Sequence, residues 1–140
     1  PKTLEYLETK GVSIIGYKTD SFPLFYTAES EYKLNLYTNE LSEIADFIIT
    51  KEKLGYTNGL LVANPVEKKF ELKKDYIDGI IEKALTLAKK NNISGKEVTP
   101  FLLDSIYKLT KGKSLETNIA LVKNNAKICA ELSRLYFERK

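Results

Sequence analysis

The sequence predicts a single α/β unit over residues 1–140, with a layered α/β/α arrangement and a mixed, partly parallel sheet. Three observations lead to this class. Two short, apolar runs rich in branched side chains, 12–17 and 59–63, are typical of buried strands. Segments with a helical spacing of apolar residues separate them, which favours parallel pairing. The chain also has no low-complexity linker and no internal repeat, so we expect one domain.

The N-terminal elements follow in the order helix, strand, loop and strand. Residues 3–10 have an amphipathic helical pattern, and Gly11 is a natural stop for a helix. After the strand at 12–17, residues 18–23 form a loop rich in turn-forming residues. Alternation at 32–37 then indicates a second, short strand.

Two predicted helices flank the strand at 59–63. Asn39 is a good N-cap for the first helix, whose apolar side chains share one face until Gly55 ends it. The second runs over 74–91 and places its isoleucines, leucines and alanines at helical spacing.

The last third of the chain is expected to be helical. Thr99 is a cap followed by Pro100 at the first helical position, which begins a short helix. Gly112 breaks that helix, and Ser114 is expected to cap a long final helix that runs to about Arg139.

Composition excludes several kinds of chemistry and partner. The chain has no histidine, which excludes Ser-His-Asp and Cys-His mechanisms and the common zinc sites. Its single cysteine, Cys129, has no partner for an internal disulfide, which suits a reducing compartment. A net charge of +3, with lysines spread among glutamates, indicates solvated faces and no nucleic-acid surface.

The sequence also bears on localisation. The first residues open directly into an amphipathic pattern without a secretory leader, and the apolar stretches are too short to cross a membrane. We therefore expect a cytoplasmic or organelle-matrix protein with no membrane partner. Because the chain contains no methionine, we also expect it to be a processed product, one piece of a cut protein, or a chain that has been renumbered.

The final helix carries two asparagines on a face that is otherwise mostly apolar. At about 100° per residue, one face is shared by the following residues: Asn118, Leu121, Val122, Asn125, Cys129 and Leu132. A buried amide without partners costs about 1–3 kcal/mol, so each asparagine needs defined hydrogen bonds. Either the two amides brace neighbouring backbone, or the face lines a polar pocket and contacts a ligand.

Three other residues are candidates for ligand contact. Asn64 follows the strand at 59–63, and ligands in open α/β sheets bind beyond the carboxyl ends of strands. Thr99 begins a helix whose free N–H groups suit a phosphate. Asp20, in the first loop, is a possible acid, base or metal ligand. The residue pattern alone favours a plain turn role for Asn64 and ordinary capping for Thr99, and a lone loop aspartate is weak evidence for a site at Asp20.

Several segments resemble the pseudouridine-5′-phosphate glycosidase family, also called indigoidine synthase A-like proteins. They run in order along the chain: TLEYLET at 3–9, GVSIIGY at 11–17, the Asp20–Tyr26 cluster, LGYTNGLLVANP at 54–65, SGKEVTPFLL at 94–103 and SLETNIALVKNNA at 114–126. The pairing of TPFLL with NIALVKNNA is the most specific part of the resemblance. It implies that this chain is the C-terminal half of such an enzyme, with a sheet completed by the missing N-terminal half.

The resemblance also implies an activity. Family members reversibly split pseudouridine 5′-phosphate into uracil and ribose 5-phosphate through a lysine imine, with a glutamate as proton shuttle and a divalent metal, typically manganese. The lysine stands just upstream of the TLEYLET motif, so it lies outside this chain, as do the glutamate and the metal ligands. Asn118 matches the family's active-site asparagine, and Asn125 matches the same motif. The family tends to be a homotrimer.

Two other functions stay open beside the glycosidase. The chain on its own is expected to lack turnover, because the imine-forming lysine is absent. The alternatives to one half of the glycosidase are a non-catalytic lobe for oligomerisation and a small-molecule binding module. A companion chain of similar size that carries the lysine would decide in favour of the enzyme.

Overall fold

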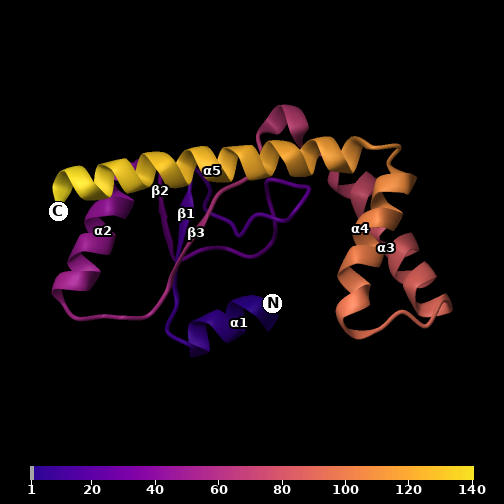
Figure 1. The fold of residues 1–140 in the computed structure, drawn as a ribbon, viewed down its shortest axis with the longest axis horizontal. Coiled ribbons are helices and arrows are strands. Elements are labelled where there is room, and N and C mark those ends of the chain that lie inside the picture. Colours follow the sequence, from indigo (N-terminus) through magenta and orange to yellow (C-terminus); the bar gives the residue numbers. More distant parts are fainter. Residues whose placement is uncertain (1) are drawn as a thin grey trace.

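A computed structural model describes residues 2–140, and Figure 1 shows how its elements are arranged. In chain order they are α1 (Lys2–Thr9), β1 (Ser13–Tyr17), β2 (Leu36–Thr38), α2 (Leu41–Lys53), β3 (Leu60–Ala63), η1 (Lys68–Phe70), α3 (Lys74–Lys90), η2 (Gly95–Glu97), α4 (Val98–Leu109) and α5 (Lys113–Arg139).

The three strands form a parallel sheet in the order β2-β1-β3, which confirms the α/β class. Ile15 pairs with Leu36 on one side and with Val62 on the other. The sheet is therefore parallel at each described pairing rather than mixed. An isolated antiparallel bridge between Ser21 and Lys33 lies outside it.

The strand expected at 32–37 begins later, at Leu36, because its first part is used elsewhere. The Phe22 N–H donates to the Tyr32 carbonyl (2.7 Å), and the Leu34 N–H donates to the Asp20 carbonyl (2.9 Å). Residues 32–34 thus fold back onto the preceding loop before the chain enters the sheet.

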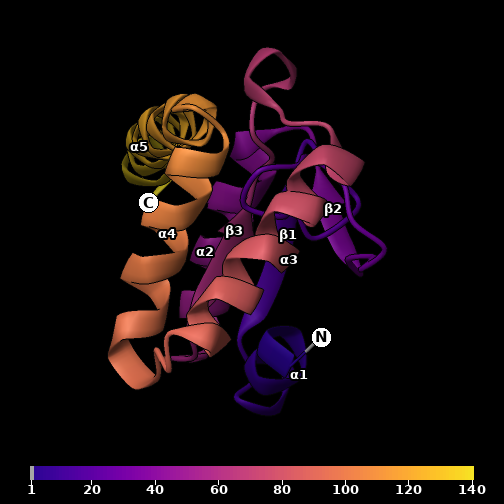
Figure 2. The same cartoon turned by 90° about the vertical axis from the view of Figure 1, so that its right-hand side faces the viewer.

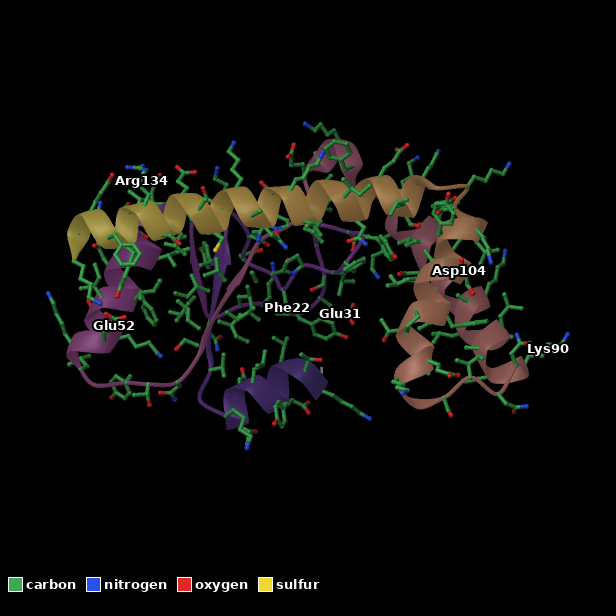
Figure 3. The ribbon with its side chains drawn as sticks, in the orientation of Figure 1. Phe22, Glu31, Glu52, Lys90, Asp104 and Arg134 are labelled. Carbon is green, nitrogen blue, oxygen red and sulfur yellow. The ribbon has the colours of Figure 1, made fainter. Side chains whose placement is uncertain are left out.

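Helices α2 and α5 cover one face of the sheet and form the first hydrophobic core. Its buried members are Ile15, Leu41 and Ile44, with Ile128, Leu132 and other side chains packed around them. At the end of α5, the Tyr136 hydroxyl donates to the carboxylate of Glu52 on α2 (2.7 Å); Glu52 is labelled in Figure 3. On the other face, a Cβ added at Gly16 would meet atoms of Thr19 and Leu34, which belong to the loop after β1.

A second core lies where α3 and α4 pack side by side, at the other end of α5 (Figures 1 and 2). Its buried members are Tyr26, Ile77, Ile80, Ala84 and Ile106. Helix α5 bridges the two cores. It contacts α4 through Ser114, whose hydroxyl accepts a hydrogen bond from Thr110 (3.0 Å), and it contacts η1 through Thr117, whose hydroxyl donates to the Phe70 carbonyl (2.7 Å).

Three predicted caps are wrong. The residue before α2 is Glu40, not Asn39, and α4 begins at Val98, which places Thr99 inside its first turn. Helix α5 begins at Lys113, so Ser114 lies within it. Gly112 makes that start possible, because its φ of 89° turns the chain sharply from α4 into α5.

Candidate functional site

The face that α5 turns toward the protein differs from the predicted one by about one residue. Asn125 and Cys129 are exposed, and Val122 is 59% exposed. The buried or half-buried positions are instead Thr117, Leu121, Asn124, Ile128 and Leu132. Both sets satisfy helical spacing, because apolar or asparagine pairs occupy neighbouring positions at 121–122, 124–125 and 128–129. Packing on the sheet selects the set that includes Asn124.

Three asparagines meet at the carboxyl end of β3. The Asn64 side-chain amide donates to the Asn125 carbonyl oxygen, Oδ1 (3.1 Å), and its own Oδ1 accepts from the Asn124 amide (3.1 Å). The structure therefore brings Asn64 and Asn125 together, as a ligand site would require. It also shows that much of their hydrogen-bonding capacity is used to join β3 to α5.

An open cleft of about 440 Å³ lies beside this asparagine cluster. Asn64 and Asn124 line it together with three lysines (Lys18, Lys68, Lys127) and four glutamates (Glu29, Glu67, Glu71, Glu131). One carboxylate oxygen of Glu71 already has a partner, because its Oε1 accepts a hydrogen bond from the Ala28 N–H (2.8 Å). With charges of both signs, the cleft suits a polar ligand and is not a plain anion site.

Asn118 lies in a different place, on a cavity of about 190 Å³ between α4, α5 and the loop that follows β1. It stands seven residues before Asn125, or about 10 Å along the helix axis. The side-chain hydrogen bonds of this part of α5 belong to Thr117, Asn124 and Asn125, and none within residues 2–140 involves Asn118. Asn118 is half-buried, and its amide has no hydrogen-bond partner among the described residues.

Tyr26, in the loop after β1, lines the same cavity. The residue is 6% exposed, and burial raises the pKa of its hydroxyl. It stays a neutral phenol at physiological pH. Sequence reasoning noted Tyr26 only as part of a motif, because nothing local shows that the loop after β1 reaches α4 and α5.

The other predicted candidates lie apart from both cavities. Thr99 is exposed in the first turn of α4, at the end of the α3–α4 pair that points away from α5 (Figure 1). Asp20 forms an exposed ion pair with Lys33 (2.8 Å), whose hydrogen bond and charge lower the pKa of the carboxyl. Its neighbours suggest a structural role in the loop.

Within residues 2–140, no group of three or more His, Cys, Asp or Glu side chains lies close enough to hold a metal ion. None of the helices in the same range combines the length and apolarity needed to cross a bilayer.

Comparison with known proteins connects this geometry to a family. The family described as "Indigoidine synthase A like protein" matches residues 1–135. A relative from Geobacillus kaustophilus named pseudouridine-5′-phosphate glycosidase is 54% identical over 132 residues, which cover 94% of this chain and 44% of the relative. A relative of the same name from Glaesserella parasuis is 52% identical, over 97% of this chain and 45% of the relative.

Solved structures show the same fold. An indigoidine synthase A-like protein from Thermotoga maritima superposes with a TM-score of 0.80 at 31% identity, over 93% of this chain and 42% of that one. A prealnumycin C-glycosynthase, solved with ribulose 5-phosphate, gives a TM-score of 0.86 at 23% identity, over 96% and 44%. The chain thus spans less than half the length of these relatives and structures.

Proposed function

The chain belongs to the indigoidine synthase A-like family, and from this premise we propose that it forms part of an enzyme that cleaves the C–C glycosidic bond of pseudouridine 5′-phosphate. The reaction consumes water and yields uracil and ribose 5-phosphate. Sequence identity of 54% and 52% with two glycosidases of that name supports the proposal. Each match covers less than half of the relative, and the proposal assigns the other part of the active site to residues outside this sequence.

The free amide of Asn118 is the observation that carries the proposal. It matches the active-site asparagine that the family resemblance implies. It is also half-buried, lines a cavity and makes no hydrogen bond to the described residues. An amide that only braced the fold would be expected to be paired, as those of Asn64, Asn124 and Asn125 are. We assign Asn118 to substrate contact, and Asn64 and Asn125 mainly to joining β3 to α5.

The remaining parts of the reaction are assigned outside this chain. The lysine that forms the imine belongs to the segment that precedes the TLEYLET motif in the family. The divalent metal has no candidate ligand set within residues 2–140, so no step of the proposal passes through it here. Thr99 receives no role, because it is exposed and far from both cavities. Assembly as a homotrimer, and a place in the cytoplasm or an organelle matrix, remain parts of this proposal.

The test is a chimaera in which this chain replaces the matching 44% of the Geobacillus kaustophilus relative. We expect the chimaera to release uracil from pseudouridine 5′-phosphate, and the 140-residue chain alone to release none. The unmodified relative serves as the positive control, and a thermal melt establishes that the chimaera is folded.

Two results would count against the proposal. A folded chimaera without uracil release would favour the alternative of a non-catalytic lobe. Turnover by the isolated chain would show that the nucleophile lies within these 140 residues and that placing the imine-forming lysine outside them is wrong.

A further inference from the structure

One buried hydroxyl joins the end of α4 to the start of α5. Thr110 ends α4 and is 1% exposed. Its hydroxyl donates to the Ser114 hydroxyl (3.0 Å) and accepts a hydrogen bond from the Ser114 N–H (3.1 Å). Gly112, the residue before α5, has no side chain that could accept from the first turn of that helix. Thr110 therefore takes over the part of an N-cap for α5 while it ends α4.

The part of α5 that carries Asn118 depends on hydrogen bonds of this kind. Among the described residues, none of the α5 side chains before Ile128 belongs to either hydrophobic core. This part of the helix is held instead by Thr110, by Thr117 on the Phe70 carbonyl, and further along by the asparagine cluster. Because hydrogen bonds are directional, they fix the position and rotation of the helix more closely than apolar contacts do.

The two threonines join α5 to different neighbours. Thr117 connects it to η1, whereas Thr110 connects it to α4, and Figure 1 shows α4 and α5 meeting at a sharp corner. Asn118 lies one helical turn after Ser114, on the same side of α5. Tyr107 of α4 lines the same cavity as Asn118. The hydrogen bonds of Thr110 thus set where α4 stands relative to the Asn118 amide.

We propose that Thr110 is a positioning residue, whose buried hydroxyl fixes the corner between α4 and α5 and so directs the Asn118 amide at the substrate. In the described part of the chain, Thr110 is not among the residues that line the cavity of Asn118, so it acts through the helix. A fully paired buried network specifies one arrangement. This inference rests on the proposed glycosidase function and goes beyond it, because it names a residue that aligns the site without touching the substrate.

The test uses the same chimaera with Thr110→Val, which keeps the shape of the side chain and removes the hydroxyl. We expect kcat per folded molecule to fall about 10- to 100-fold, because a displacement of about 1 Å is enough for such a loss. Thr110→Ser keeps the hydroxyl and should stay close to the parent. Thr117→Val is the matched control: it removes a buried hydroxyl from α5 itself, and should lower the melting temperature while kcat stays close to the parent value.

A double-mutant cycle with Asn118→Ala separates positioning from a general loss of stability. If Thr110 acts through Asn118, Thr110→Val should slow the Asn118→Ala chimaera little further, because the amide that it directs is already absent. The two losses should then fall short of multiplying by at least about tenfold. Losses that multiply in full would mean that Thr110 does not act through Asn118, and would overturn the inference.

The remaining outcomes separate this inference from the proposed function. If the parent chimaera is active and Thr110→Val loses only stability, as Thr117→Val is expected to, the positioning role is wrong and the glycosidase function stands. Thr110→Ala is made as a second variant without the hydroxyl. If neither it nor Thr110→Val folds, Thr110 serves folding alone and the inference is wrong. If the parent chimaera is folded and inactive, the proposed function fails and the inference fails with it.

Discussion

Replacing Asn118 by alanine should slow turnover strongly and leave the fold intact. The Asn118 amide makes no hydrogen bond to the described residues, so its loss breaks no internal bond. Asn118 is half-buried and its amide has no internal partner, so we expect its replacement to change the free energy of unfolding by about 0.5 kcal/mol or less. If the amide binds the reacting substrate, its removal should slow turnover by about 10²–10³-fold, which corresponds to about 2.7–4 kcal/mol of transition-state stabilisation.

The adjacent residue provides a matched control. Thr117 is 1% exposed, and its hydroxyl donates to the Phe70 carbonyl (2.7 Å). Thr117→Val keeps the shape of the side chain but leaves that carbonyl without its donor, which costs about 1–3 kcal/mol of folding free energy. We therefore expect opposite effects from neighbouring positions: loss of stability at Thr117, and loss of turnover at Asn118.

Both variants are made in the chimaera with the Geobacillus relative, and uracil release is measured beside denaturant unfolding. Asn118→Asp should slow turnover about as much as Asn118→Ala, because it puts a charge in place of a neutral donor in a semi-buried site. Turnover near the parent value in Asn118→Ala, combined with a clear loss of stability, would refute the assignment of Asn118 to the substrate.

Two further predictions concern the scaffold. Gly16→Ala should destabilise the protein by about 1–3 kcal/mol or more, because the added Cβ would lie 2.1 Å from the Thr19 carbonyl oxygen and 2.9 Å from Leu34. Gly79→Ala is its control: Gly79 lies within α3, nothing stands within 4 Å of an added Cβ, and alanine should stabilise the helix by about 0.5–1 kcal/mol. Chemical denaturation of both variants tests the pair, and equal effects would contradict it. At the asparagine cluster, Asn64→Ala and Asn124→Ala should each cost about 0.5–1.5 kcal/mol, and the double variant should cost less than their sum by at least about 0.5 kcal/mol. Additive losses in this double-mutant cycle would mean that the Asn64–Asn124 bond does not contribute.

The sequence predicted the elements whose signal is local. The strands at 12–17 and 59–63 and the helix at 74–91 lie within one residue of the observed β1, β3 and α3, because branched apolar runs and helical spacing act over a few residues. The second strand was placed early, since the hydrogen bond from Leu34 to Asp20 depends on how the loop folds back.

The candidate site was predicted less well, because it depends on packing between distant segments. Asn64 and Asn125 were chosen for different reasons and do meet, 61 positions apart in the sequence. The face of α5 was misplaced by about one residue, because Asn124 and Asn125 fit a helical stripe equally well until the sheet is in place. Tyr26 carried no local sign of function. Its place beside Asn118 follows only from the cavity that α4 and α5 form with the loop after β1.

The continuity of α5 has a consequence for how this protein can vary. Asn118 faces one cavity and Asn124 another, six positions apart on an unbroken helix, so their separation is set at about 9 Å along its axis. A single inserted or deleted residue between them would rotate everything beyond it by about 100°. Either Asn124 would leave Asn64, or Asn118 would leave the cavity of Tyr26. The exposed side of this segment can accept many substitutions, but its length cannot change by one residue without separating the two sites from their partners.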